Sequence, residues 1–349
     1  RSVRSTQGIA QKIVASVPSG SRDAAHIRQA VAVSLPTMRL SSGQKAQLEK
    51  FKFEPTQIAD IHNNLRRMTN QFDTPGPDMR KVEDFNVEID DSHLPVPVRL
   101  YVPHNASEGP GPTFIYFHGG GFVTGSIESH EGITRRIASG TGFRVLSVEY
   151  RLAPQFAYPA GPDDVEFVLN WALDGYGQDE WGIDRSNIAI GGDSAGGNMA
   201  AYLAQKYRKD IRAQVLFYPL MQMVDFKPPK PGPQDWLQLG FMALKFIDEH
   251  YVAGADATEP RLSPMFKADL PNMPPAYILT AGLDPLRDEG KSYADKLAAH
   301  GCAVTYHHEK AMPHGFLNFA RAFPKAKSVP LDAADVLRKY FPKPQQLRD

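Results

Sequence analysis

The stretch that decides the fold is Asn-Ile-Ala-Ile-Gly-Gly-Asp-Ser-Ala-Gly-Gly-Asn, residues 187–198. Its first four residues form an apolar run typical of a buried parallel strand, and residues 198–207 carry apolar side chains at helical spacing. Between the two, Gly192, Ser194 and Gly196 fit the pattern G-x-S-x-G. This spacing predicts a sharp turn from strand to helix, in which the glycines let both elements pass closely and the serine adopts a strained backbone conformation.

Composition and charge exclude several classes of protein. The chain has 349 residues, 42% of them hydrophobic, which suits one large α/β domain with an elaboration or two smaller domains. Its 39 basic residues balance 39 acidic ones, so we expect no nucleic-acid partner. No apolar run approaches the roughly 18 to 20 residues of a membrane span. Cys302 is the only cysteine, which excludes an internal disulfide and a cysteine-based zinc site.

We expect a cytoplasmic location. Because the chain begins at Arg1 rather than at methionine, a removed signal peptide stays open as an alternative.

The order of predicted elements indicates the fold class. Residues 1 to about 80 have helical spacing, and the alternating apolar residues of 85–89 and 96–102 predict an antiparallel hairpin. Strands and helices then alternate, which is typical of a parallel α/β sheet. The expected strands are 113–117, 144–148, 187–190, 214–217, 276–280 and 304–307.

One segment interrupts this alternation. Residues 227–233 are rich in proline and predict a non-helical connector, and an aromatic stretch with Trp236 and Phe241 follows. The aromatic density favours a lid that pairs with the N-terminal helices, with an ordinary core helix as the alternative.

The turn after the first strand of the alternation is rich in glycine. Functional groups of an α/β sheet lie at the carboxyl ends of its strands. His118-Gly-Gly-Gly-Phe122 follows residues 113–117, and its glycines permit positive φ angles that leave N–H groups free to point at a bound oxygen. The run lacks the lysine of a P-loop and the spacing of a dinucleotide site. It therefore favours an oxyanion hole, with the N–H of Ala195 as a further donor.

Three carboxylates compete for the role of acid after residues 276–280. Asp284 lies closest to the strand end, and Pro285 favours an extended backbone at Asp284. Asp288 and Glu289 are expected in the first turn of the next helix, where they favour its dipole. Asp284 is therefore the predicted acid.

Among eleven histidines, His314 stands in a loop after the last strand and follows both Ser194 and Asp284. Serine, then acid, then histidine is the chain order of one known fold. A metal site built from His307, His308 and His314 is the alternative, but adjacent histidines on a strand point to opposite faces. The sequence therefore favours a catalytic triad without a metal or a cofactor.

These motifs together resemble the hormone-sensitive lipase family of α/β-hydrolases, in its G-D-S-A-G branch, which is similar to bacterial family IV esterases. The resemblance runs from about residue 80 to 320 and rests on residues 118–121, 149–154, 192–197, 284–290 and 314–316. It implies an α/β-hydrolase fold with a mostly parallel eight-stranded sheet, flanking helices and a helical cap. The cap would comprise residues 1–80 and an insertion at about 225–255, and the catalytic domain would span residues 81–349.

The resemblance also assigns roles to single residues. It implies that Ser194 is the nucleophile, His314 the general base and acid, and Asp284 the acid that orients the histidine. The oxyanion donors implied are the N–H groups of Gly119, Gly120 and Ala195. Asp193 is expected to brace the turn and Arg151 to pair with Asp163 or Asp164. Glu149 and Gln155 stand where the family usually has aspartate and glutamate, which puts only local salt bridges in doubt.

The predicted function is a serine carboxylesterase that hydrolyses short- to medium-chain esters through an acyl-enzyme. The alternatives are an amidase or deacetylase, or a small-molecule receptor similar to the plant gibberellin receptors, which lack the catalytic histidine. A homodimer formed through a sheet edge is common among similar proteins, although no stretch here demonstrates it. Candidate pocket or lid residues, with core packing as the alternative for each, are Phe122, Tyr218, Trp236 and Phe241.

Overall fold

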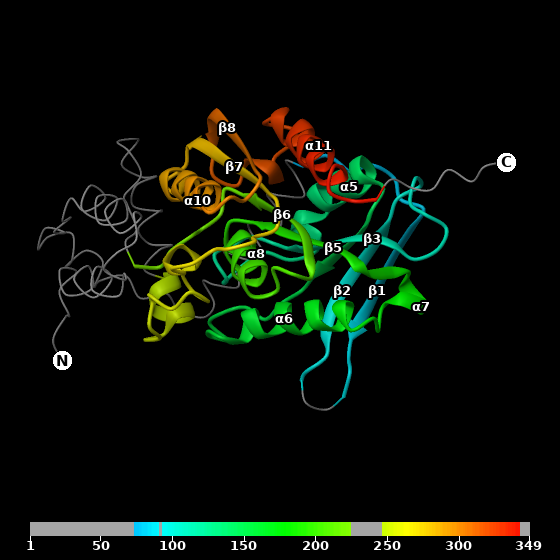
Figure 1. The fold of residues 1–349 in the computed structure, drawn as a ribbon, viewed down its shortest axis with the longest axis horizontal. Coiled ribbons are helices and arrows are strands. Elements are labelled where there is room, and N and C mark those ends of the chain that lie inside the picture. Colours follow the sequence, from blue (N-terminus) through cyan, green and yellow to red (C-terminus); the bar gives the residue numbers. More distant parts are fainter. Residues whose placement is uncertain (1–72, 91–92, 225–245, 343–349) are drawn as a thin grey trace, which may run out of the picture. The chain divides into compact units, whose positions relative to one another are not determined.

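The structure is a computed structural model that describes residues 73–90, 93–224 and 246–342, all within the unit Pro55–Asp349. Its centre is an eight-stranded sheet with the order β1-β2-β4-β3-β5-β6-β7-β8 (Figure 1). β1 pairs with β2 and β2 with β4 in antiparallel fashion, and the other pairs are parallel. The strands are β1 (Lys81–Val87), β2 (Val96–Val102), β3 (Gly111–Phe117), β4 (Arg144–Val148), β5 (Ile183–Asp193), β6 (Ile211–Phe217), β7 (Ala276–Leu283) and β8 (Val304–Pro313).

Helices cover both faces of the sheet. Apolar residues of α6, α8 and α10 belong to one core cluster, and those of α5 and α11 to another. α5 and α11 lie against each other (Figure 1), and a Cβ atom at Gly140 of α5 would stand 2.9 Å from the Ala334 Cβ atom of α11. The α-helices are α5 (Glu131–Thr141), α6 (Ala160–Leu173), α7 (Gln178–Trp181), α8 (Ala195–Lys206), α10 (Arg287–Ala299) and α11 (Lys325–Arg338).

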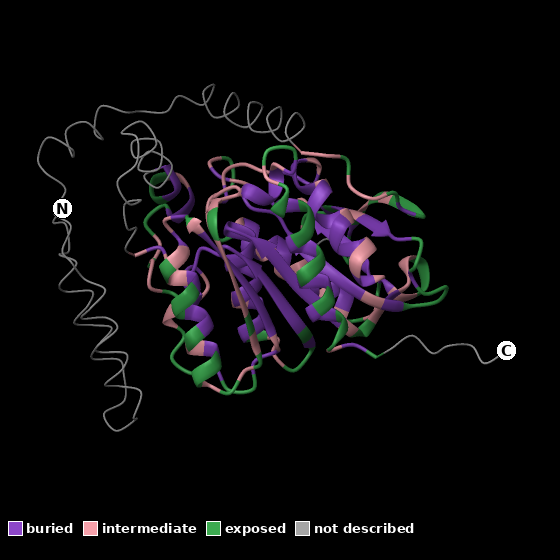
Figure 2. Ribbon diagram, turned by 90° about the horizontal axis from the view of Figure 1, so that it is seen from above, coloured by how far each residue is buried: buried purple, intermediate pink, exposed green. Residues whose placement is uncertain are grey.

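Burial follows from this layering. All five residues of β4 are buried, because helices cover both faces of a central strand. β1 mixes exposed and buried residues, as an edge strand does. Figure 2 shows the central strands buried and exposed residues along the outer sides of the helices. The mostly parallel α/β sheet expected from the sequence is confirmed, and so is the hairpin of β1 and β2.

Several strands extend beyond their predicted bounds, β5 and β8 by the most residues. β5 begins at Ile183 rather than at residue 187, and β8 continues to Pro313 rather than ending at residue 307. In both cases pairing continues beyond the apolar core: Ile183 lies opposite Gly111 of β3, and Pro313 opposite Leu283 of β7. Backbone hydrogen bonding does not require apolar side chains, so periodicity underestimates such strands.

Two predicted parts lie mostly outside the described residues. These are the N-terminal helical segment, of which only 73–80 are described, and the lid segment at 225–245 with Trp236 and Phe241. After that gap the chain forms a single π-helical turn, Asp248–Val252, in which Tyr251 is buried. Within the described ranges, no helix is long and apolar enough to cross a membrane.

Candidate active site

The strand-to-helix turn around Ser194 is strained, as G-x-S-x-G predicts. Ser194 stands between the end of β5 and the start of α8 with φ 54° and ψ −114°, a conformation that few residues other than glycine adopt. Three backbone hydrogen bonds hold it: its N–H donates to the Phe217 carbonyl at 2.9 Å, and its carbonyl accepts the Asn198 N–H at 3.1 Å and the Leu220 N–H at 3.2 Å. The surrounding strands therefore impose the conformation.

The glycines of the motif are required by close contact between elements. A Cβ atom at Gly196 would lie 1.9 Å from the Phe117 carbonyl oxygen, and one at Gly192 would lie 2.2 Å from the same oxygen. Both contacts are with the backbone of β3, which has no room to move aside. The end of β5 at Gly192 and the start of α8 at Gly196 can approach β3 this closely only because both positions lack a side chain.

His314 connects Ser194 to a buried carboxylate. Its Nε2 lies 2.9 Å from the Ser194 Oγ, and its Nδ1 lies 2.7 Å from Asp284 Oδ2. The Asp284 side chain is fully buried, whereas that of His314 is 34% exposed. The other carboxylate oxygen, Oδ1, accepts the Leu286 N–H at 2.8 Å, which fixes the plane of the carboxylate. The turns at the carboxyl ends of β5, β7 and β8 thus each contribute one side chain to a continuous chain of hydrogen bonds.

The charge of Asp284 affects the histidine. Burial lowers the pKa of His314, but the attraction and the hydrogen bond from Asp284 outweigh burial, so its pKa is raised above the ordinary value. An imidazolium that forms at this position is therefore stabilised.

The two competing carboxylates lie elsewhere, as predicted. Asp288 and Glu289 are in the first turn of α10. Asp288 pairs with Arg287, and Glu289 accepts the Met221 N–H at 2.6 Å. Asp284 bonds directly to His314, whereas Glu289 only adds to the attraction that raises the pKa of His314.

The glycine loop after β3 corrects one prediction. The Gly119 N–H donates to Asp193 Oδ1 at 2.8 Å, so it is engaged within the fold and is not free for an oxyanion. Gly120 and Gly121 have φ angles of 121° and 63°, and none of the hydrogen bonds between described residues uses their N–H groups. Ala195 is the first residue of α8, so its N–H has no partner within the helix. The available donors are therefore those of Gly120, Gly121 and Ala195.

The two described pocket candidates are buried. Phe122 has φ 64° and stacks on Tyr251 with 3.9 Å between ring centroids. Tyr218 packs edge-on against the His314 ring at 5.0 Å. Each is only 1% exposed, so in this conformation they support the glycine loop and the histidine rather than present a surface to a ligand.

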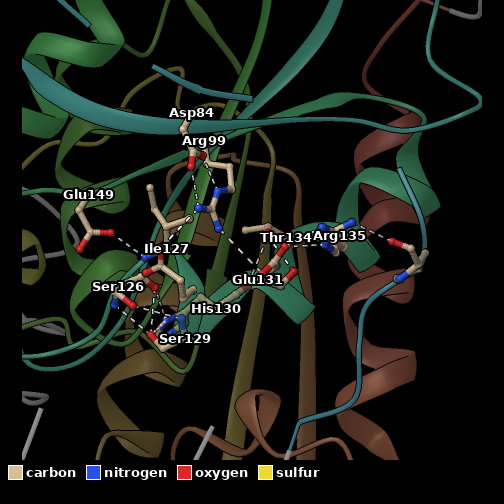
Figure 3. Close-up of polar contacts among 12 residues, drawn as sticks. Asp84, Arg99, Ser126, Ile127, Ser129, His130, Glu131, Thr134, Arg135 and Glu149 are labelled. Atoms are coloured by element: carbon tan, nitrogen blue, oxygen red, sulfur yellow. Dashed lines mark hydrogen bonds and ion pairs between the residues drawn. The ribbon is translucent and has the colours of Figure 1, made fainter. Parts of the chain in front are cut away.

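The expected supporting contacts are present. Arg151 pairs with Asp164 at 2.6 Å, whereas Asp163 pairs with Arg261. Glu149, which stands where the resemblance leads us to expect an aspartate, accepts the Ile127 N–H at 2.7 Å (Figure 3). The longer side chain therefore still makes a local hydrogen bond.

The three histidines of the alternative metal site have other partners. His307 bonds to Glu309 at 2.9 Å, and the His308 ring to the Thr280 hydroxyl at 2.9 Å. In the part of the chain that the structure describes, no group of three or more His, Cys, Asp or Glu side chains is arranged to hold a metal ion.

Comparison with known proteins defines the class. The family model described as "alpha/beta hydrolase fold" matches residues 114–318. The chain belongs to this family, in the hormone-sensitive lipase-like branch of family IV esterases.

Particular relatives are similar over most of their length. Carboxylesterase NlhH of Mycobacterium tuberculosis is 38% identical over 280 residues, which cover 77% of this chain and 86% of NlhH. Esterase LipI of the same organism is 36% identical over 276 residues, 77% of this chain and 84% of LipI. Among solved structures, a hyperthermophilic esterase from Pyrobaculum calidifontis is similar, with a TM-score of 0.74 and 31% identity. The match covers 86% of this chain and 99% of the esterase chain.

Proposed function

We propose that this protein is a carboxylic ester hydrolase in which Ser194 is the nucleophile and short- to medium-chain esters are the substrates. The observation that carries the proposal is the chain of hydrogen bonds from Ser194 Oγ through the His314 ring to the buried Asp284 carboxylate. The names of the relatives, carboxylesterase and esterase, support the class of reaction. The receptor alternative is disfavoured, because a binding site has no need of a histidine within hydrogen-bonding distance of a strained serine.

The first half of the reaction forms an acyl-enzyme. His314 Nε2 accepts the Ser194 hydroxyl proton as Oγ attacks the ester carbonyl, and Asp284 holds the Nδ1–H and stabilises the imidazolium. The tetrahedral oxyanion accepts hydrogen bonds from the N–H groups of Gly120, Gly121 and Ala195. When the intermediate collapses, the bond to the alcohol oxygen breaks and His314 returns the proton to that oxygen.

The second half repeats the steps with water. His314 takes a proton from water, whose oxygen attacks the acyl carbonyl, and the bond to Ser194 Oγ breaks. The carboxylic acid leaves and Oγ regains its proton. The strained turn contributes by placing Oγ and the Ala195 N–H on the same side of the carbonyl, at the N-terminus of α8, where the helix dipole favours negative charge.

We further propose that residues 1–80 and the insertion at about 225–255 form a cap over a catalytic domain of residues 81–349. Support comes from the described end of the insertion. Tyr251 stacks on Phe122 of the glycine loop, and its carbonyl accepts the Tyr158 N–H at 3.0 Å. The segment therefore contacts the loop that supplies the oxyanion donors.

The test is Ser194→Ala with p-nitrophenyl acetate and butyrate as substrates. We expect turnover to fall by about four to six orders of magnitude, because loss of the nucleophile leaves only the oxyanion hole and binding. The matched control is Ser328→Ala, which removes an exposed hydroxyl in α11 and leaves turnover unchanged. A fluorophosphonate probe should add its mass to Ser194 in the wild type only. Undiminished turnover in Ser194→Ala would refute the proposal.

A second candidate is an amidase or deacetylase with the same residues. It is favoured by one relative, arylacetamide deacetylase of Bos taurus, which is 28% identical over 303 residues. Cleavage of an amide needs His314 to protonate the leaving nitrogen. The ratio of kcat/KM for a p-nitrophenyl ester and the p-nitroanilide of the same acid separates the two, and a ratio near one would favour the amidase.

A further inference from the structure

A buried histidine that takes no part in the proposed mechanism lies behind the active site. His130 ends the 3-10 turn Glu128–His130 that precedes α5, and it is only 4% exposed. Its Nε2 lies 3.3 Å from Oδ1 of Asp193, the residue before Ser194. No motif in the sequence points to His130.

Asp193 holds the glycine loop through the same oxygen atom. Oδ1 accepts the Gly119 N–H at 2.8 Å and the Tyr116 hydroxyl at 2.6 Å, and the side chain is 3% exposed. Burial raises the pKa of Asp193, but the attraction of His130 and the hydrogen bonds from His130 and Tyr116 outweigh it and lower the pKa. Asp193 is therefore an anion, and a buried anion without a cationic partner is costly.

The surroundings of His130 suit a doubly protonated ring. Its Nδ1 lies 2.8 Å from the Ser129 Oγ and 3.3 Å from the Ser126 carbonyl oxygen, both of which accept a hydrogen bond (Figure 3). An imidazolium donates from both nitrogens, so it bonds to acceptors on this side and to Asp193 on the other.

Asn318 extends the network to the third catalytic loop. Its side-chain amide lies 3.1 Å from His130 Nε2, while its Oδ1 is buried and has no hydrogen-bond partner among the described residues. The oxygen and nitrogen of an amide are exchanged by a half-turn, which would place Oδ1 against the Nε2–H of a charged His130. Asn318 follows His314 by four residues, in the 3-10 turn Phe316–Asn318.

We propose that His130 is a positioning residue, held as an imidazolium, that connects the glycine loop, the Ser194 turn and the His314 loop through Asp193 and Asn318. The inference rests on the proposed function. His130 pairs with Asp193 at 3.3 Å, and the charge of His118 adds a smaller attraction that also lowers the pKa of Asp193. The contact with Gly119 fixes the backbone immediately before Gly120 and Gly121, whose N–H groups are the proposed oxyanion donors.

The groups that face His130 support its charge. Burial lowers the pKa of His130, but attraction by Asp193, the hydrogen bond to Asp193 and the Ser126 carbonyl raise it above its ordinary value, and the charge of Glu149 adds to this. The His118 and Tyr116 rings pack nearby, with centroids 5.5 Å and 6.3 Å from that of His130.

The kinetic consequence falls mainly on kcat. Oxyanion donors interact most strongly with the transition state, so their misplacement slows the chemical step and changes substrate binding little. Loss of one donor costs about 100- to 1000-fold in kcat, and a loosened loop should cost less. We therefore expect His130→Gln to lower kcat for p-nitrophenyl butyrate by about 10- to 100-fold, with KM within about threefold of wild type.

A double-mutant cycle tests the coupling. Asp193→Asn alone should lower kcat to a similar extent, and the double variant His130→Gln, Asp193→Asn should be no more than about threefold slower than the slower single variant, because both changes break the same connection. The matched control is His104→Gln, which alters an exposed histidine paired with Asp78 and should keep wild-type kcat.

A spectroscopic measurement tests the charge independently of activity. In a ¹H–¹⁵N spectrum of histidine side chains at pH 7.5, one imidazolium with both nitrogens protonated should be present in the wild type and absent from His130→Gln. If Asp193→Asn does not fold, this spectrum and the single variant His130→Gln still decide the matter.

Two results would overturn the inference. One is wild-type kcat in folded His130→Gln, and the other is a neutral His130 ring at pH 7.5. Ser194→Ala, measured in parallel, keeps the two proposals apart: if it stays active, the proposed function fails, whereas an inactive Ser194→Ala beside a fully active His130→Gln refutes only the role of His130.

Discussion

Replacing Asp284 by asparagine removes one charge from the site and keeps the shape of the side chain. In the native site Oδ1 accepts the Leu286 N–H at 2.8 Å, and Oδ2 faces the His314 Nδ1 at 2.7 Å. The asparagine oxygen must stay opposite Leu286, because an NH₂ group there would face another donor. The NH₂ group therefore faces His314 and donates to Nδ1, which forces the ring proton onto Nε2.

The magnitude follows from that tautomer. Nε2 lies 2.9 Å from the Ser194 Oγ and must be unprotonated to accept its proton. A wrongly protonated histidine costs about 10⁴-fold in kcat in this type of site, which corresponds to about 5 kcal/mol of activation free energy. The variant also loses the attraction that raises the pKa of His314, so the acid limb of the remaining pH–rate profile should shift to lower pH.

The assay is steady-state hydrolysis of p-nitrophenyl butyrate from pH 5 to 9, with Asp288→Asn as the matched control. Asp288 is exposed, pairs with Arg287 and should tolerate the change with kcat within about twofold of wild type, apart from a loss of stability of about 0.3–1 kcal/mol from the helix dipole. If Asp284→Asn keeps more than a tenth of the wild-type kcat, or if Asp288→Asn is the variant that fails, the acid has been assigned wrongly.

Two further predictions concern stability. Gly196→Ala places a Cβ atom 1.9 Å from the Phe117 carbonyl oxygen and should lower the free energy of unfolding in urea by about 3 kcal/mol or more. The control Gly109→Ala meets no atom within 4 Å and should change this free energy by less than about 0.5 kcal/mol. Equal urea midpoints for the two variants would contradict the close contact of α8 with β3. Lys296 donates to two backbone carbonyls, and burial lowers its pKa to about 8. Between that value and the higher pKa of Lys296 in the unfolded chain, only the unfolded state holds the proton on Lys296. The free energy of unfolding of the wild type should therefore rise by about 1–3 kcal/mol from pH 7.5 to 10 relative to that of Lys296→Met. Parallel pH profiles of the two proteins would contradict this prediction.

Much of this protein follows from local sequence patterns. The G-x-S-x-G spacing predicts the strained turn, because glycines two residues on either side of Ser194 serve mainly to let strand and helix pass closely. The alternation of apolar runs predicts the order of strands. The position of Asp284 before Pro285 singles out one of three carboxylates, and that prediction agrees with its bond to His314. Each of these inferences depends on backbone geometry that a few neighbouring residues determine.

Other features follow from contacts between distant segments. Three consecutive glycines imply free N–H groups, yet Gly119 donates to Asp193, which lies 74 residues further along the chain. The aromatic residues Phe122 and Tyr218 suit a pocket by type, but packing against Tyr251 and His314 buries them. His130 has no motif around it and meets Asn318 across 188 residues.

The sequence by itself therefore determined the order of the elements, the strained turn and the three residues of the candidate triad. Only the tertiary structure decided which backbone N–H groups remain free for an oxyanion and which histidine lies against Asp193. The physical reason is that an N–H group has a single proton to donate. Whether that proton is already engaged depends on which acceptor the folded chain brings to it, and a distant acceptor leaves no trace in the local pattern.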